Sequence, residues 1–90
     1  TGAKLIFCTT TPVAPETTSP FRSNEDAEIY NAAAVKIMTA HGIEIDDLYS
    51  FAKPQLEKIQ LPKNVHYTPE GSKTLATQVV ASIQSKLAKP

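Results

Sequence analysis

The stretch Lys4-Leu5-Ile6-Phe7-Cys8-Thr9 is a continuous run of apolar and β-forming residues, followed by a region rich in threonine and proline. Runs without polar alternation are typical of strands that are covered on both faces, as in parallel sheets. A buried helical turn is the alternative, but the run is too short for a helix and Pro12 closes it. The stretch therefore predicts a buried strand over residues 4–9, with Cys8 as an inert, buried thiol.

A helix is predicted after the long loop formed by residues 9–23, which is rich in threonine, serine and proline. Ser23 or Asn24 can cap its first turn, acidic residues follow the cap, and Gly42 is a typical stop. Apolar residues recur with helical spacing and predict its buried stripe. They are Ile29, Tyr30, Ala33, Ala34, Ile37 and Met38.

A second strand is predicted over residues 43–48, where apolar and acidic residues alternate. A strand, a helix and a second strand in this order indicate a right-handed parallel crossover. The fold class that follows is α/β, with a parallel sheet.

The rest of the chain, residues 49–90, predicts two further helical pieces. Residues 51–59 form a short amphipathic turn or helix, and a loop and a brief extended piece follow. Thr68 as N-cap and Pro69 at the first helical position then open a last helix. Its apolar face is built by Leu75, Ala76, Val79, Val80, Ile83 and Leu87.

Composition narrows the function classes. The 90 residues form one small domain at most, and nine basic residues balance nine acidic ones. That balance argues against nucleic-acid binding, and no apolar run is long enough for a membrane helix. The single cysteine permits no internal disulfide, and no cysteine or histidine spacing suggests a metal site or a cofactor. The start at Thr1 leads us to expect a piece of a longer chain.

The segment Asn64-Val65-His66-Tyr67-Thr68-Pro69-Glu70-Gly71 resembles the C-terminal block of the SGNH (GDSL-type) hydrolases. In that family a histidine precedes an aromatic residue, a Thr-x-x-Gly turn and a final helix. Residues 5–13 resemble the family's penultimate strand and active-site loop, and Asp46-Asp47-Leu48-Tyr49 resembles the end of its last strand. The resemblance covers nearly the whole chain, with the three motifs in the family's order.

The resemblance implies a fold and a function. Residues 1–90 would be a single partial domain, the C-terminal half of a three-layer α/β/α (flavodoxin-like) hydrolase. The activity would be that of a serine ester hydrolase on a small ester such as an acylated carbohydrate, with no metal or cofactor. His66 would be the general base that deprotonates the nucleophilic serine.

This chain departs from the family pattern at two points. Where the family has the aspartate of its Asp-x-x-His pair, the chain has Lys63, so the group that orients His66 has to be another one. The Gly-Asp-Ser nucleophile block and the oxyanion-hole blocks occur nowhere in the 90 residues, and none of the six serines lies in a nucleophile-like context. Candidates for orienting His66 or lining the pocket rim are Asp46, Asp47, Asn64, Arg22 and Tyr67.

Because the nucleophile and oxyanion-hole blocks are missing, the chain is expected to need a partner. Two short strands make a narrow sheet, so we expect the chain to associate with a missing N-terminal half or with further copies of itself. The alternative function is a non-catalytic, truncated fragment that folds by self-association. The cellular location is open, and a secreted or periplasmic parent would suit an esterase of this family.

Overall fold

A computed structural model describes residues 2–14, 23–62 and 66–89 of the chain. It is a small mixed α/β structure with a two-stranded sheet. In chain order the elements are β1 (Ile6–Cys8), α1 (Asn24–Ala40), β2 (Glu44–Asp46), α2 (Leu48–Ala52), the 3₁₀ turn η1 (Lys53–Gln55), α3 (Leu56–Ile59) and α4 (Pro69–Leu87).

The sheet is parallel, as the strand–helix–strand order predicts. Ile6 pairs with Glu44, and Cys8 pairs with Asp46. Both strands are shorter than predicted, for local reasons. Lys4 lies outside β1, since the pairing begins with Ile6 and Glu44, and its ammonium group binds the last carbonyls of α4, including those of Lys86 and Leu87. Leu48 was predicted to end the second strand, but it begins α2.

The predicted ends of α1 are confirmed. The Ser23 hydroxyl accepts a hydrogen bond from the backbone N–H of Asp26 over 3.1 Å, which is the N-cap arrangement. At the other end, Gly42 has a φ of 70°, which lets the chain turn sharply out of the helix into β2.

The predicted start of α4 is also confirmed. Thr68 caps it by accepting a hydrogen bond from Gly71 N–H over 2.9 Å, and Pro69 occupies the first turn. Gly71 is buried against the end of α3, where an added Cβ would lie 2.0 Å from the carbonyl oxygen of Ile59. The N-terminus of α4 can therefore approach α3 closely because residue 71 has no side chain.

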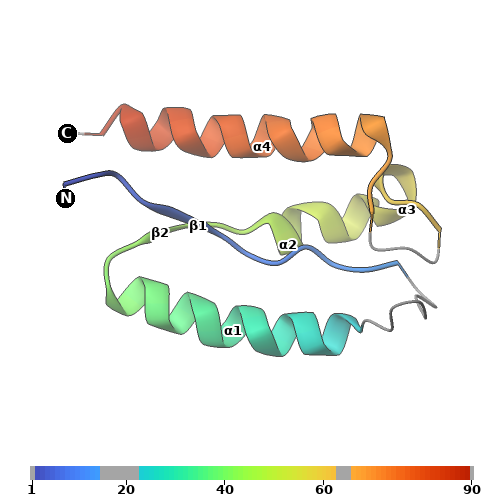
Figure 1. The fold of residues 1–90 in the computed structure, drawn as a ribbon, viewed down its shortest axis with the longest axis horizontal. Coiled ribbons are helices and arrows are strands. Elements are labelled where there is room, and N and C mark those ends of the chain that lie inside the picture. Colours follow the sequence, from blue (N-terminus) through green and yellow to red (C-terminus); the bar gives the residue numbers. More distant parts are fainter. Residues whose placement is uncertain (1, 15–22, 63–65, 90) are drawn as a thin grey trace.

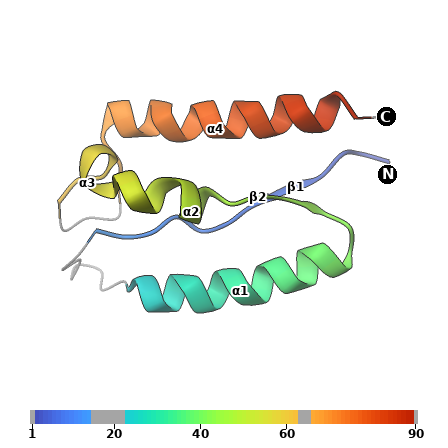
Figure 2. The same ribbon diagram turned by 180° about the vertical axis from the view of Figure 1, so that it is seen from behind.

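The two long helices lie on opposite sides of the strands (Figure 1). The view from behind shows the same arrangement, with α2 and α3 on the α4 side and both chain ends at the amino end of β1 (Figure 2). The short elements α2 and α3 therefore connect the carboxyl end of β2 to the start of α4.

The core is thin and centres on α2 and α3. Its buried apolar residues are Ala14, Leu48, Tyr49, Ala52 and Ile59. The prediction that the apolar stripe of α1 is buried is wrong for several members, because Asn31 faces the interior instead. The large apolar side chains that the structure leaves exposed are Leu5, Ile29, Tyr30, Ile37, Leu61, Val80, Ile83 and Leu87.

The prediction that Cys8 is buried is also wrong. Among the described residues β1 has one strand neighbour, and Cys8 is exposed at the end of β1. Partial desolvation, together with the charge of Asp46, raises the pKa of the thiol. A thiol with a raised pKa is a poor nucleophile at neutral pH, and the low reactivity of Cys8 stays a prediction.

None of the described helices is long and apolar enough to cross a membrane.

Candidate functional site

Segment 9–14 follows β1 at the carboxyl end of the sheet, where parallel α/β folds place their ligands. Two asparagines of α1 hold it by its backbone. Asn31 accepts from Thr10 N–H over 2.8 Å and donates to Thr10 C=O over 2.9 Å. Asn24 makes the same pair of bonds to Val13, at 2.7 and 3.2 Å. Each asparagine thus imitates a strand neighbour, and the segment keeps an extended path beyond β1.

Thr9 links this segment to the end of β2. Its N–H donates to Asp46 C=O over 3.1 Å, and its hydroxyl donates to Asp47 Oδ1 over 2.9 Å. The same hydroxyl oxygen accepts from the backbone N–H of Tyr49 over 2.9 Å. Thr9 is buried, so these bonds fix the carboxyl ends of the two strands relative to each other.

His66 lies in a short turn between α3 and α4, and its neighbours on either side of the turn are anchored. Gln60 and Tyr67 form an isolated antiparallel bridge, and Leu61 N–H donates to His66 C=O over 3.0 Å. Thr68 N–H donates to Ile59 C=O over 2.9 Å. The backbone of His66 is thereby fixed, while its side chain is exposed.

Tyr67 and Gln60 join the turn of His66 to the segment after β1. The Tyr67 hydroxyl and the Gln60 side-chain amide both donate to the carbonyl oxygen of Pro12, each over 3.1 Å. Pro12 is among the most deeply buried residues. Burial raises the pKa of Tyr67, although a hydrogen bond with Thr11 acts in the opposite direction. Tyr67 is therefore a neutral donor that docks the turn, and its role at the rim of a catalytic pocket stays a prediction.

Asp46 and Asp47, the predicted orienting carboxylates, lie at the end of β2. Asp46 is 2% exposed, and its Oδ1 accepts from the side-chain amide of Gln78 on α4 over 3.2 Å. Asp47 caps α2, and its Oδ2 accepts from the Ser50 hydroxyl over 2.7 Å. Partial burial raises the pKa of Asp47, but the hydrogen bonds from Ser50 and Thr9 outweigh it, and the pKa lies below its ordinary value. Both side chains thus take part in joining β2 to neighbouring elements.

Three sequence predictions concern residues outside the described part of the chain. Arg22, predicted at the pocket rim, and Asn64, predicted beside His66, both lie there. Lys63, which replaces the family's aspartate, lies there as well.

The sequence analysis missed a cluster between α1 and α2. The Tyr49 hydroxyl donates to Glu28, whose carboxylate also accepts from Lys53 over 3.2 Å. The Lys53 ammonium lies 5.5 Å from the centre of the Tyr49 ring. The hydrogen bonds from Tyr49 and Lys53 lower the pKa of Glu28. Tyr49 and Lys53 are four residues apart, but Glu28 lies more than 20 residues earlier in the chain, so only the fold brings it to the other two.

A small cavity of about 190 Å³ lies beside the turn of His66. Ala14, Leu56 and Leu61 supply its apolar lining, and Gln60 contributes from the bridge to Tyr67. A second cavity of about 270 Å³ lies between α1 and α2, and Thr9, Asp47 and Ser50 are in its wall. Both cavities are therefore lined in part by residues from the carboxyl end of the sheet.

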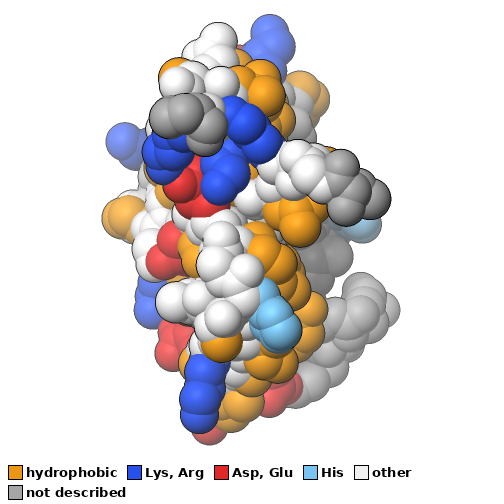
Figure 3. All heavy atoms as spheres, turned by 90° about the vertical axis from the view of Figure 1, so that its left-hand side faces the viewer, with side chains coloured by type: hydrophobic (Ala, Val, Ile, Leu, Met, Phe, Trp, Pro, Cys, Tyr) orange, Lys and Arg blue, Asp and Glu red, His pale blue; other side chains and the backbone are white. Residues whose placement is uncertain are grey.

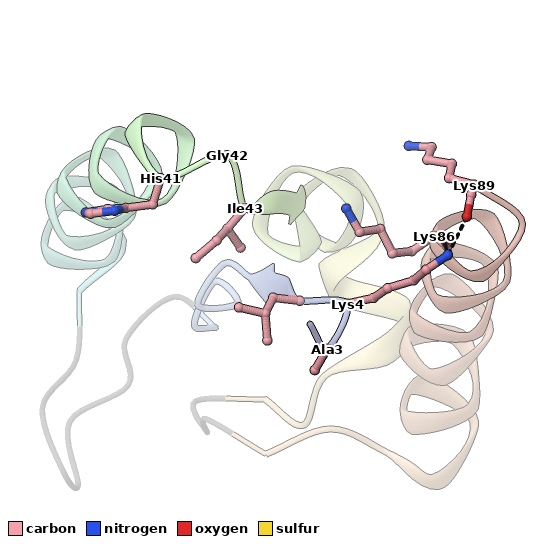
Figure 4. Close-up of a pocket in the computed structure, with 8 residues that line it drawn as sticks. Ala3, Lys4, His41, Gly42, Ile43, Lys86 and Lys89 are labelled. Atoms are coloured by element: carbon pink, nitrogen blue, oxygen red, sulfur yellow. Dashed lines mark hydrogen bonds between the residues drawn. The ribbon is translucent and has the colours of Figure 1, made fainter. Parts of the chain in front are cut away.

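A third cavity, of about 250 Å³, lies at the opposite end of the molecule, where residues 3–5 meet the ends of α1 and α4 (Figure 4). Lys4 uses its ammonium group to bind the carbonyls that end α4, and Lys89 pairs with Glu44. The His41 ring points away from the hollow (Figure 4). The ammonium groups of Lys4 and Lys89 therefore bind the end of α4 and Glu44, and they do not converge on a ligand site.

Among the described residues no group of three or more histidine, cysteine, aspartate or glutamate side chains could hold a metal ion. Comparison of the chain with known proteins found no matching family model, no matching curated protein and no matching solved structure.

Proposed function

We propose that this chain is the C-terminal portion of a three-layer α/β/α hydrolase of the SGNH (GDSL-type) kind. In this proposal it supplies the catalytic base, His66, of a serine ester hydrolase. The support comes from the sequence motifs around residues 5–13, 46–49 and 64–71 and from the arrangement at the carboxyl end of the sheet.

The observation that best supports this proposal is the pair of hydrogen bonds that Gln60 and Tyr67 donate to the carbonyl oxygen of Pro12. The motif with His66 and the loop after β1 are about 50 residues apart, yet Tyr67 and Gln60 tie them together at one buried carbonyl. An accidental likeness of short sequence motifs gives no reason for such a junction. A catalytic histidine has to be held within hydrogen-bond reach of its partner. A junction that fixes the turn of His66 to the loop after β1 would serve this purpose.

In the proposed mechanism His66 takes the proton of a serine hydroxyl as the serine attacks the ester carbonyl. It then returns this proton to the alcohol that leaves. The nucleophile and the donors that stabilise the oxyanion have to come from polypeptide outside these 90 residues, because the sequence has no block of that kind. A base without these groups gives little acceleration, so the chain by itself should be nearly inert.

The cavity lined by Gln60 and Leu61, whose backbones bind the turn that carries His66, favours a small acyl group. His66 does not line the cavity itself. The cavity's volume of about 190 Å³ and its largely apolar lining, interrupted by Glu57 and Gln60, suit an acetyl or similarly short chain. We therefore propose short acyl esters, such as acetylated carbohydrates, as the substrate class.

The test uses a parent polypeptide that carries a Gly-Asp-Ser block upstream of this chain. His66→Ala should lower hydrolysis of a p-nitrophenyl acetate reporter by a factor on the order of 10⁴–10⁶, because the serine loses its proton acceptor. His41→Ala is the matched control, since His41 ends α1 at the other end of the molecule. It should retain activity.

Two results would contradict the proposal. One is saturable ester hydrolysis by the 90-residue chain alone, since it would require a nucleophile among the six serines. The other is equal activity of the His66→Ala and His41→Ala variants in the parent.

A further inference from the structure

We infer that α1 is the contact helix of a two-fold symmetric dimer of this chain. The proposal concerns a face along α1, and it does not depend on the proposed catalytic role of His66. The face is a strip of exposed side chains that runs the length of the helix. Its members are Asp26, Tyr30, Ala33, Ile37 and His41.

The strip is apolar at its centre and exposed along its whole length. Its five residues follow the spacing i, i+4, i+7, i+11 and i+15, which places them on one side of a helix. Tyr30 and Ile37 are each 56% exposed, although both are large and apolar. The buried Asn31 and the half-buried Val35 define a different side, which packs on the sheet and segment 9–14, and the half-buried Ala34 lies between the two sides.

The strip is complementary to itself when two copies run in opposite directions. With a two-fold axis between Ala33 and Ala34, Tyr30 of one protomer meets the partner's Ile37, and Ile37 meets the partner's Tyr30. The same register brings Asp26 against the partner's His41 at both ends. A two-fold interface requires this kind of reciprocal match, whereas a different partner protein would not require α1 to match itself.

Small residues lie where the helices would cross. Ala33 is exposed at the centre of the strip, and a small side chain there lets two helices approach to the distance of 8–10 Å that is typical of packed helices. The larger Tyr30 and Ile37 lie one turn away on either side and fill the space where the axes diverge.

Apolar side chains are also exposed on the other long helix, which lies on the opposite side of the strands and therefore outside the α1 contact. Val80, Ile83 and Leu87 form an exposed stripe on α4. Hydrophobic side chains gather along the right-hand side of the molecule in Figure 3. The α1 strip is therefore only part of the exposed apolar surface. It is the part in which the order of side chains matches itself in an antiparallel pair, which is why we infer a second copy as its partner.

The test compares two adjacent alanines by sedimentation equilibrium of the 90-residue chain. The unmodified chain should have twice the monomer mass. Ala33→Glu places two carboxylates at the two-fold axis and should raise the dissociation constant of the dimer by about 100-fold or more. Ala32→Glu is the matched control, because residue 32 is also exposed but lies about 100° around the helix from residue 33, at the cavity between α1 and α2. It should leave the dimer intact, and circular dichroism should show both variants folded.

A cross-link gives an independent readout of the register. In a Cys8→Ala background, Ala33→Cys should form a disulfide between protomers under mild oxidation, whereas Ala32→Cys should not. A charge exchange tests the strip's ends: Asp26→Lys and His41→Glu should each weaken the dimer, and the double variant should restore it. A folded monomer over the whole concentration range overturns the proposal. A dimer that withstands Ala33→Glu, or one that cross-links equally at both positions, overturns it as well.

Discussion

Asp46 and Asp47 are neighbours in the chain, but the structure gives them different partners. Asp46 is almost fully buried and binds Gln78 of α4, whereas Asp47 is exposed and caps α2. As orienting groups for His66 both stay predictions, and activity assays of Asp46→Asn and Asp47→Asn in the parent polypeptide would test them. Their hydrogen bonds in the structure already explain why two carboxylates end β2.

The N-cap of α2 at Asp47 leads to a prediction about how the stability of the protein depends on pH. Because its pKa is below the ordinary value of 3.8, the ionised carboxylate stabilises the folded state. This contribution is fully present above the unfolded-state pKa and is lost as the pH falls through the folded-state pKa. In Asp47→Asn the amide still caps the helix but carries no charge. The stability difference between the two proteins should therefore narrow as the pH falls from about 5 toward 3, by urea denaturation. A difference that stays constant with pH would contradict this account.

A second residue-scale prediction concerns the N-cap of α4. Thr68→Ala removes the hydroxyl that accepts from Gly71 N–H, and it should cost about 0.5–2 kcal/mol of stability at a fixed chain concentration. Thr77→Ala is the control: the Thr77 hydroxyl bonds to the carbonyl of Lys73 within the exposed face of α4, and its loss should change stability by less than about 0.5 kcal/mol. Equal losses would mean that the cap does not fix the start of the helix.

At the scale of elements, the sequence predicted what depends on local signals. Ser23, Gly42 and Thr68 mark helix ends through bonds or dihedral angles within a few residues, and the structure has these ends close to where they were predicted. The parallel pairing of the strands was also predicted from element order.

The side of α1 that is buried could not be predicted in this way. Apolar spacing favours Ile29, Tyr30 and Ile37, yet Asn31 is the buried residue because its amide bonds to the backbone of Thr10. That contact depends on a segment 21 residues away. For the same reason the junction of Tyr67 with Pro12, across 55 residues, has no signal in the sequence.

The close contact of α4 with α3 gives an element-scale prediction. In an exposed helix, Gly→Ala would stabilise by up to about 1 kcal/mol, but at position 71 the new Cβ would lie 2.0 Å from Ile59 oxygen. The two helices would have to separate, so Gly71→Ala should destabilise by about 1–3 kcal/mol. Ser72→Ala, at the exposed neighbouring position, should be neutral or slightly stabilising. If Gly71→Ala proved as stable as Ser72→Ala, the contact between α3 and α4 would be looser than described.

At the scale of the whole molecule, the two proposals use different surfaces. The proposed hydrolase site lies at the carboxyl ends of β1 and β2, where Tyr67 binds Pro12. The proposed dimer contact runs along α1 and is centred on Ala33. Loss of one property by mutation therefore need not affect the other, and each proposal can fail separately.

Because the core is thin, we expect the stability of the fold to depend on association with a second copy. The buried apolar side chains of the described residues are few, while large apolar side chains on α1 and α4 stay exposed in the single chain. A protomer of this kind gains a substantial part of its stability from its partner, and stability then depends on chain concentration. The melting temperature should accordingly rise by about 5–10 °C over a 100-fold increase in concentration.

Ala33→Glu isolates the cause of that dependence. It should lower the melting temperature at high concentration and remove most of the concentration dependence, whereas Ala32→Glu should keep both. Differential scanning calorimetry of the three proteins across the concentration range makes the comparison. If the unmodified chain melted at one temperature throughout, its few buried side chains would suffice for stability, and the exposed strip of α1 would need another explanation.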